Sequence, residues 1–297
     1  MIRTLFMGFR VFSSRFALTA LFLVFAGFAQ APPKAVIRVP VANMFSAASP
    51  DTDVVSQAIY ASEVSLLARK DGFSQARTSD DYTGWIRNED LLSSANPYPA
   101  SGAVAVIRSV TANLYREPDV TAHAALLTVP FETHLEIIPQ PPPENRDYFH
   151  IRLVDGREAW LDRGDVEANP HKLTIPESIE LAKRFLGITY TWGGRSSFGF
   201  DCSGFTQMLV RSRGITMPRD ANQQAAWSGA VPADRRHLKP GDLLFFGDSA
   251  DRITHTGMYI GKGQFIHDTT SGHPGVQISR VNDQPWTKLL VAARRIQ

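Results

Sequence analysis

The spacing of hydrophobic positions along the chain changes near residue 172. Before this point, apolar residues alternate with polar ones in short runs separated by turn residues, as in "VIRVPVANMF" from Val36 and "VIRSVTANLY" from Val106. Alternation with a period of two is typical of half-buried strands. After it, two stretches carry apolar residues at helical spacing, one ending at Gly187 and one beginning at Cys202. The pattern predicts β-rich units followed by a mixed domain, an α+β architecture.

The two alternating stretches are copies of one unit. Val, Ile, Arg, Ala and Asn recur between Val36 and Val106, and each copy closes with a tryptophan strand, "GWIRNEDL" and "AWLDRGDV". A repeat of roughly 60 residues made of short strands predicts two successive small β-barrels. We expect the first barrel over residues 34–98, the second over 103–168, and a third domain over 172–297.

A helix start opens the third domain. Thr174 lies three residues before Glu177, with Pro176 between them, which is the pattern of a capping box with proline in the first turn. The predicted helix ends at Gly187. Its expected buried face consists of Ile179, Ala182, Phe185 and Leu186.

The N-terminus has the layout of a secretory signal. Three arginines precede an apolar run from Phe16 to about Phe28, which is followed by small residues. A membrane anchor is the alternative, but the run is shorter than the ~20 residues that span a bilayer. We predict a signal peptide over residues 1–29, cleaved after Ala29 or Ala31, with Pro32 favouring the earlier site. The mature protein is then exported to the periplasm or secreted, with no stable membrane insertion.

The charge balance gives no sign of a nucleic-acid partner. The chain has 31 basic and 29 acidic residues, and removal of the first 29 residues takes away three arginines and leaves 28 against 29. A nearly neutral protein lacks the basic excess typical of nucleic-acid binding. We expect no nucleic acid among its partners.

Cys202 is the only cysteine, so it cannot form an internal disulfide. It follows the glycine-rich stretch "YTWGGRSSFGFD" and precedes apolar residues at helical spacing, which predicts a place in the first turn of a helix. Unpaired N–H groups and the helix dipole at that place favour a thiolate over a thiol. The alternative is an inert cysteine in the core.

Two histidines are candidate partners for this thiol. "ITHTGMYIGKGQFIHD" predicts a hairpin whose turn begins at Gly261, and His255 and His267 each lie six residues from Gly261. Without a bulge they would be cross-strand neighbours with Cβ atoms ~5 Å apart. One imidazole could then take the thiol proton while the other orients it. Zinc bound by these three residues is the alternative, but no HxxxH or CxxC spacing supports it, and we expect no metal and no cofactor.

These residues also carry a family resemblance. "YTWGG" from Tyr190, "DCSGF" from Asp201, "LKPGDLLFF" from Leu238 and "THTGMYIGKGQFIH" from Thr254 resemble the NlpC-type cell-wall cysteine peptidases, which have a papain-like fold. The two repeated units look like bacterial SH3-like domains. The whole arrangement is similar to the γ-D-glutamyl-diamino-acid endopeptidases.

The resemblance implies a mechanism and its residues. Cys202 would be the nucleophile, His255 the base and His267 the orienting third member, while the Tyr190 hydroxyl would support the oxyanion. The reaction would be hydrolysis of the γ-D-Glu to meso-diaminopimelate bond in peptidoglycan stem peptides or muropeptides.

The resemblance also implies a pocket for the free amine of an N-terminal L-alanine. By position it would use Asp201 with Glu63 from "YASEVSLL" and Tyr82 from "DDYTGW", and Ser203 would help to line it. Glu63 as an exposed strand residue and Tyr82 as a packing residue are the alternatives. Ala221 departs from the family pattern, which often has a small hydroxyl residue there, so one polar substrate contact is in doubt.

Two other functions remain open on the sequence alone. A hydrolase of intact, crosslinked cell wall would need an open cleft, whereas a cleft narrowed by the first SH3-like unit favours fragments, as in muropeptide recycling. An inactive protein that only binds the cell wall through its SH3-like units is the alternative from a different class.

Overall fold

The computed structural model describes residues 1, 32–93, 98–100, 102–139, 147–168 and 170–296. The predicted signal peptide over residues 1–29 lies outside the described residues, apart from Met1. Pro32–Gln297 forms one unit, which contains all of the described strands and helices. None of the helices within the described ranges is both long and apolar enough to cross a membrane.

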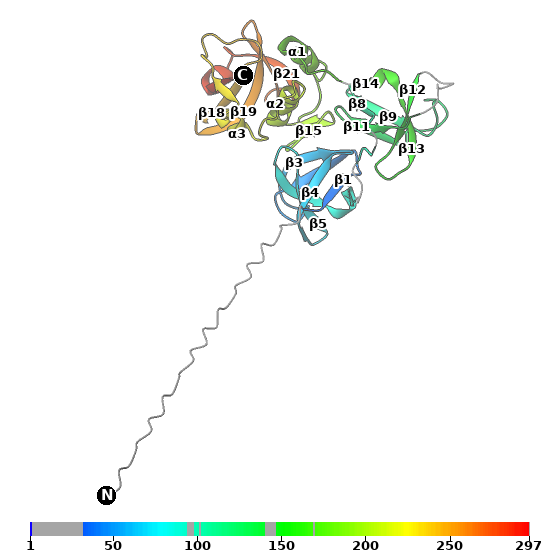
Figure 1. Cartoon of the computed structure of the whole chain (residues 1–297). Helices are drawn as coiled ribbons and strands as arrows, with labels where there is room; N and C mark the ends of the chain where they lie inside the picture. Colours follow the sequence, from blue (N-terminus) through cyan, green and yellow to red (C-terminus); the bar gives the residue numbers. More distant parts are fainter. Residues whose placement is uncertain (2–31, 94–97, 101, 140–146, 169, 297) are drawn as a thin grey trace. The chain divides into compact units, whose positions relative to one another are not determined.

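The first sheet is antiparallel, with the strand order β3-β2-β6-β5-β4-β1-β7. Figure 1 shows it in blue and cyan, with β1, β3, β4 and β5 labelled. A short 3-10 helix, Asn88–Asp90, precedes its last strand. Its strands are β1 (Lys34–Ile37), β2 (Val41–Phe45), β3 (Val54–Ile59), β4 (Glu63–Lys70), β5 (Phe73–Arg77), β6 (Thr83–Arg87) and β7 (Leu91–Ser93).

The second sheet repeats this topology strand for strand, in the order β10-β9-β13-β12-β11-β8-β14. A 3-10 helix, Arg163–Asp165, again precedes the last strand. Its strands are β8 (Val104–Ile107), β9 (Thr111–Tyr115), β10 (Leu127–Pro130), β11 (His134–Ile137), β12 (Tyr148–Arg152), β13 (Glu158–Asp162) and β14 (Val166–Ala168).

The sequence repeat corresponds to equivalent core positions. Met44 and Leu114, at matching places in β2 and β9, are both fully buried, and each belongs to the hydrophobic core of its own sheet. Alternate residues of a strand point to opposite faces, so the repeated apolar positions give each sheet its own core.

The third part of the chain combines helices with a six-stranded antiparallel sheet, in the order β17-β22-β18-β19-β20-β21. Its helices are α1 (Ile175–Lys183), α2 (Cys202–Arg211), α3 (Ala221–Ala226) and α4 (Trp286–Leu289). Its strands are the short pair β15 (Arg195–Ser196) and β16 (Gly199–Phe200), then β17 (Ala230–Pro232), β18 (Leu243–Ser249), β19 (Arg252–Gly261), β20 (Gln264–Thr269), β21 (Gly275–Arg280) and β22 (Leu290–Ile296).

Helix α1 begins as predicted but is shorter. The Thr174 hydroxyl accepts the Glu177 N–H while the Glu177 carboxylate accepts the Thr174 N–H, so the capping box is present. The helix ends at Lys183, and a turn carries the chain onward to Gly187. Leu186 is therefore not part of the buried face and is 45% exposed, which corrects the prediction for this residue.

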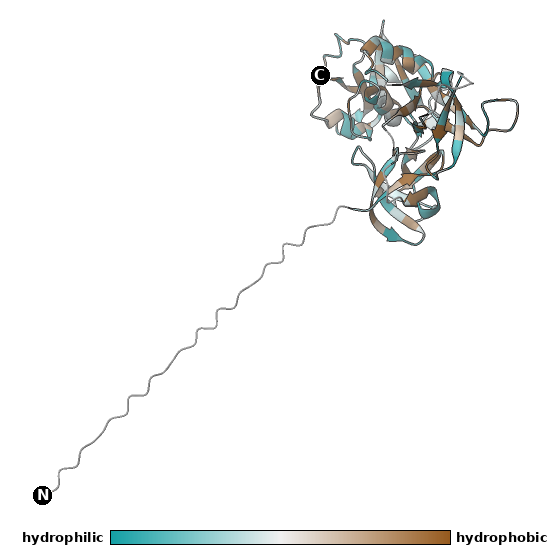
Figure 2. Cartoon of the chain, turned by 45° about the vertical axis from the view of Figure 1, so that its right-hand side comes forward, coloured by the Kyte–Doolittle hydropathy of each residue, from teal (hydrophilic) through white to brown (hydrophobic). Residues whose placement is uncertain are grey.

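The main core of the third part lies between helices α1 and α2 and one face of the sheet. It includes Phe185 from the turn after α1, Phe205 and Met208 from α2, and Met258 and Ile266 from the strands. A second cluster around Trp286 covers the opposite face. In Figure 2 brown, apolar stretches alternate with teal, hydrophilic ones along the strands and helices.

Candidate active site

Cys202 is the first residue of α2, where the sequence predicts it. The Asp201 side chain caps the helix by accepting the Gly204 N–H at 2.7 Å. A Cβ atom on Gly204 would lie 2.1 Å from the carbonyl oxygen of Gly194. Glycine is therefore required for the glycine-rich segment to cross the helix start closely and present Cys202 there.

The two histidines lie together, but not through the predicted register. Met258 pairs with Ile266 and Tyr259 with Phe265, and a β-bulge follows between Tyr259 and Gly261. The bulge adds one residue to β19, and because the turn is also centred beyond Gly261, the pairing ends two residues away from the predicted register; since this difference is even, both imidazoles keep the same face. Their rings are 5.0 Å apart, and His255 Nε2 lies 2.8 Å from His267 Nδ1.

Gly257 makes this contact possible. A Cβ atom there would lie 2.9 Å from the Cβ of His267, so only glycine leaves room beside that side chain. His267 is fully buried, and its Nε2 lies 3.0 Å from the Ser279 hydroxyl oxygen. If each imidazole donates through Nε2, His255 Nδ1 stays unprotonated and free to act as a base.

Burial keeps both imidazoles neutral at neutral pH. It lowers the pKa of His255 to about 4, although the charge of Asp201 acts in the opposite direction. Burial and the neighbouring His255 lower the pKa of His267 to about 2. Ser279, which completes the chain of contacts, was missed from the sequence because its strand β21 carries no motif.

The prediction of a thiolate in the free protein is wrong. Cys202 is only 7% exposed, and burial, followed by the charge of Asp201, raises the pKa of its thiol to about 12. The backbone N–H groups of Thr256 and Ser203 act against this increase but do not cancel it. The sulfur therefore carries its proton at rest, and a base has to remove that proton during the reaction.

His255 is the candidate base for this thiol, because it lies next to Thr256 in the sequence. The N–H of Thr256, the next residue, bonds to the sulfur, so β19 passes the start of α2. No hydrogen bond joins Cys202 to His255 in the described ranges of this resting structure. Tyr190 pairs with Phe200, two residues before Cys202, and burial followed by the charge of Cys202 raises the pKa of its hydroxyl.

Arg219 organises the residues around the cysteine, and the sequence alone did not identify it. It is 1% exposed and donates to both carboxylate oxygens of Asp201, at 3.0 and 2.6 Å, and to the Ser203 hydroxyl at 2.8 Å. It also donates to the Gly194 carbonyl and, from the first sheet, to the Ser56 hydroxyl. All five of its N–H groups are bonded, so Arg219 connects β3 with the start of α2.

The four residues predicted to bind the substrate amine do not gather in one place. Glu63 forms an ion pair with Lys34 at 2.6 Å and lines a cavity that does not include Cys202 or Asp201. Tyr82 lines a different cavity, of about 600 Å³, beside Arg219 and Asp220. The Tyr82 hydroxyl lies 3.3 Å from Asp220, and the charges of Asp220 and Asp201 both act on it.

Glu63 was chosen from its position in the sequence, and the structure separates it from the others. Its strand, β4, lies apart from β3, which contacts Arg219, and β4 pairs with β1 and β5. The structure does bring Asp201, Ser203 and Tyr82 together around Arg219, with Asp220 as the additional carboxylate.

Asp268, next to His267, is a further group that the sequence did not reveal. Its side chain is fully buried, and neither carboxyl oxygen has a partner with good hydrogen-bond geometry within the described residues, although the neighbouring Thr269 N–H acts to lower its pKa. Burial, with a contribution from the charge of Asp201, raises its pKa to about 8. A carboxyl group without partners is held in its neutral form in such a place.

No metal site accompanies these residues in the part of the chain that is described. No three histidine, cysteine, aspartate or glutamate side chains there are grouped to hold an ion. The arrangement is therefore a buried thiol, an adjacent chain of two imidazoles and a serine, and a phenol, which is suited to acyl transfer through a thioester.

Comparisons with known proteins agree with this chemistry. The NlpC/P60 family matches residues 187–295, and the bacterial dipeptidyl-peptidase SH3 domain matches residues 44–91. The chain is 31% identical to the γ-D-glutamyl-L-lysine dipeptidyl-peptidase of Bacillus cereus, over 81% of this chain and 74% of that protein. It is 36% identical to the Bacillus subtilis protein of the same name, over 54% of each chain.

A solved structure extends the likeness to the fold. The crystal structure of an NlpC/P60 family protein from Bacillus cereus superposes with a TM-score of 0.77 and 26% identity, covering 89% of this chain and 99% of that one. The expected α+β fold, an NlpC-type domain behind an SH3-like region, is thereby confirmed. The chain belongs to the NlpC/P60 family and is a cysteine peptidase.

Proposed function

We propose that this peptidase hydrolyses the bond between γ-D-Glu and meso-diaminopimelate in peptidoglycan stem peptides, and that it acts on fragments with a free N-terminal L-Ala. Hydrolysis of peptidoglycan peptides follows from the relatives, which include a murein DD-endopeptidase of Escherichia coli at 35% identity over 43% of this chain. The two Bacillus relatives support the γ-D-glutamyl linkage, since their names specify it.

The observation that carries the proposal is the contact chain from His255 through His267 to Ser279, which begins on the strand whose Thr256 N–H bonds to the Cys202 sulfur. His255 Nδ1 takes the thiol proton as the Cys202 sulfur attacks the γ-carbonyl carbon of D-Glu. The resulting tetrahedral oxyanion is held by the Cys202 backbone N–H and the Tyr190 hydroxyl. Imidazolium then protonates the departing amine, and a thioester remains on the sulfur.

The second half of the reaction reverses these roles. Neutral His255 takes a proton from water as hydroxide adds to the thioester carbonyl. Collapse of that intermediate breaks the C–S bond, releases the γ-carboxyl group of the product and returns the electron pair to sulfur, which takes the proton back from the imidazolium. His267 is a positioning residue, because it acts through His255 rather than on the substrate. Its neutral imidazole, held by Ser279, keeps the His255 ring in the tautomer that leaves Nδ1 free.

We further propose that the free amine is recognised by Asp201, Ser203 and Tyr82, without Glu63. Asp201 acts on the pKa of Tyr82 and lies beside Ser203, which supports this grouping. Two carboxylates, those of Asp201 and Asp220, face one guanidinium, so an arriving ammonium group would be attracted by an unbalanced negative charge.

Contacts between the first sheet and the start of α2 support a preference for fragments over intact wall. Gln57 accepts the N–H of Arg195 at 3.1 Å, and Asp80 accepts from Arg195 and Gln207. The first sheet therefore occupies one side of the region near Cys202, where a crosslinked wall would need free access.

The experiment uses L-Ala-γ-D-Glu-meso-diaminopimelate, its N-acetylated twin and purified sacculi, with products identified by mass and the Cys202→Ala variant as a blank. We expect cleavage of the free tripeptide into L-Ala-γ-D-Glu and diaminopimelate, and much slower cleavage of the twin. Equal rates on both would remove the amine pocket. Efficient release from sacculi would favour the intact-wall alternative, and no cleavage of any γ-bond would refute the proposal.

Two further parts of the proposal concern the ends of the domains. We propose export of the chain through a signal peptide over residues 1–29, and domains over 34–98, 103–168 and 172–297, the second of them SH3-like. The identical strand order of the two seven-stranded sheets supports the second SH3-like domain. N-terminal sequencing of the exported protein tests the cleavage site, and limited proteolysis tests the boundaries.

A further inference from the structure

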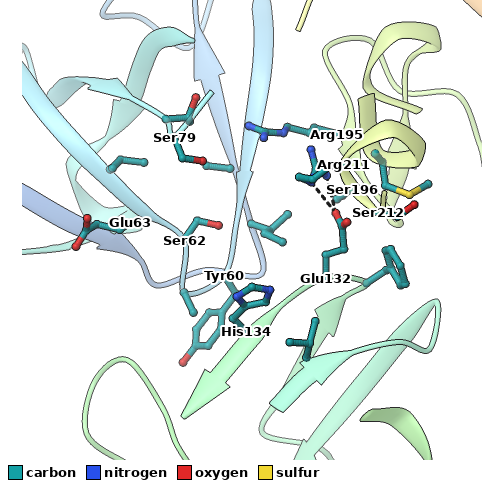
Figure 3. Close-up of a pocket in the computed structure, with 18 of the residues that line it drawn as sticks. Tyr60, Ser62, Glu63, Ser79, Glu132, His134, Arg195, Ser196, Arg211 and Ser212 are labelled. Atoms are coloured by element: carbon teal, nitrogen blue, oxygen red, sulfur yellow. Dashed lines mark hydrogen bonds and ion pairs between the residues drawn. The ribbon is translucent and has the colours of Figure 1, made fainter. Parts of the chain in front are cut away.

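A second cavity, of about 630 Å³, lies where the first sheet, the second sheet and the third part of the chain meet. Figure 3 shows side chains from all three around it, among them Tyr60, Glu132 and Arg195. Neither Cys202 nor the two histidines of the active site are among its lining residues. Its volume falls in the ~300–1,000 Å³ range of small-molecule sites.

The same turn of the two repeats helps to form this cavity. Ala61 and Glu132 follow β3 and β10, and both have left-handed backbone conformations, each with φ 65°. Each donates its N–H to the equivalent strand, to Ile37 and Ile107 respectively. A non-glycine residue rarely adopts this conformation, so the backbone is strained where it borders the cavity.

Positive charge is in excess on the cavity wall. Two glutamates, Glu63 and Glu132, are among its lining residues. Two more carboxylates, Asp80 and Glu167, pair with cations of the wall from outside the lining. Against these four carboxylates stand six cationic side chains, which are Lys34, Arg77, Arg108, Lys172, Arg195 and Arg211.

Two guanidinium groups from neighbouring elements lie at the centre of this charge. Arg195 is 12% exposed and pairs with Asp80 at 3.2 Å, while Arg211 pairs with Glu132 at 2.6 Å (Figure 3). Burial, and next the positive charge of Arg211, lower the pKa of Arg195 to about 10. The two cations therefore repel each other across a wall that water screens poorly.

One buried donor on this wall has no partner among the residues that the structure describes. Arg211 donates to Glu132 through Nε and Nη2, whereas its Nη1 is buried and makes no hydrogen bond within the described residues. A buried guanidinium nitrogen without an acceptor is costly, whereas the rest of the Arg211 side chain is 33% exposed and can be reached by a ligand. Arginine pairs of this kind bind carboxylate or phosphate groups with two parallel hydrogen bonds.

We propose that this cavity is a second binding site, for a small molecule that bears two or more anionic carboxylate or phosphate groups. One group is placed between Arg195 and Arg211, and another faces Arg77 and Lys172, which form no ion pair with the residues that the structure describes. Hydroxyl groups on the wall, including Ser62 and Ser212, supply further hydrogen bonds. This second site is independent of the proposed peptide substrate, because no residue of the reacting centre takes part.

The test measures binding to the mature chain with the Cys202→Ala substitution, which prevents turnover. Citrate, inorganic phosphate and L-Ala-γ-D-Glu are titrated by calorimetry at constant ionic strength, with acetate as the single-charge control. We expect citrate or phosphate to bind at least tenfold more tightly than acetate, and the stronger of the two identifies the carboxylate or phosphate source. If the Tyr82→Phe substitution weakens the binding of L-Ala-γ-D-Glu, that dipeptide binds at the active site and not in this cavity.

Two variants locate the binding. Arg77→Gln removes one cation of the wall, and the paired change Arg211→Gln with Glu132→Gln removes the central charge without leaving a carboxylate unpaired. Each should weaken binding at least tenfold, whereas Arg236→Gln, an exposed cation outside the cavity, should leave it unchanged. Binding that is equal in all variants, or no binding of any probe below about 10 mM, would overturn the proposal.

Discussion

Removal of the buried ion pair between Arg219 and Asp201 tests whether this pair stabilises the start of α2, where Cys202 lies. Arg219→Met removes all five hydrogen bonds of the guanidinium and leaves the Asp201 carboxylate buried without its counter-ion. Breaking one partner of such a pair typically lowers the free energy of unfolding by ~3–5 kcal/mol. With a urea slope of about 1–3 kcal/mol per M, the unfolding midpoint should fall by roughly 1–5 M.

Urea titration followed by tryptophan fluorescence measures this change. The matched control is Arg219→Met combined with Asp201→Asn, because asparagine carries no charge and still caps the helix. This double variant should recover at least ~1 kcal/mol of the loss. The reasoning is refuted if the single variant loses less than ~1 kcal/mol, or if the double variant is no more stable than the single one.

Three other predictions concern the reacting groups. Iodoacetamide should label Cys202 slowly at pH 7 and faster as the pH rises toward 10 and beyond, because burial raises the thiol pKa to about 12. A labelling rate that already levels off near pH 7 would contradict this. Asp268 keeps its proton in the folded chain up to about pH 8 but loses it near pH 4 when the chain is unfolded. The free energy of unfolding should therefore fall as the pH rises from about 4 to about 8, by at most ~1.4 kcal/mol per pH unit. Urea midpoints of Asp268→Asn should depend less on pH over this range. His267→Ala should lower kcat by ~10²-fold or more, because His267 contacts the base directly. Ser279→Ala should lower it by only ~10-fold, since the serine acts through one neutral hydrogen bond to His267. Equal losses of kcat in the tripeptide assay would contradict this order.

Local sequence signals predicted the elements that carry the chemistry. The capping box at Thr174 and Glu177 and the helix start at Cys202 depend on residues within one turn of each other, so they can be recognised without the fold. The shared face of His255 and His267 also followed from counting. The position of the turn and the one-residue bulge together moved their register by two residues, an even number, which preserves the face.

The ionisation of the cysteine could not be predicted in the same way. The helix dipole is a local property, and it favours the thiolate. Burial of Cys202 and the charge of Asp201 outweigh it, and burial depends on how α2 packs against β19 and the glycine-rich segment. The sign of the pKa shift is therefore a result of packing.

By itself, the sequence determined the repeat, the helix starts, the hairpin and the residue types of a thiol peptidase, because each depends on neighbours along the chain. Only the tertiary structure decided that Arg219 holds Asp201, that Ser279 completes the imidazole chain, and that Glu63 lies elsewhere. These contacts join residues from different strands and helices. Their partners are chosen by packing in three dimensions, which leaves no periodic pattern in the sequence.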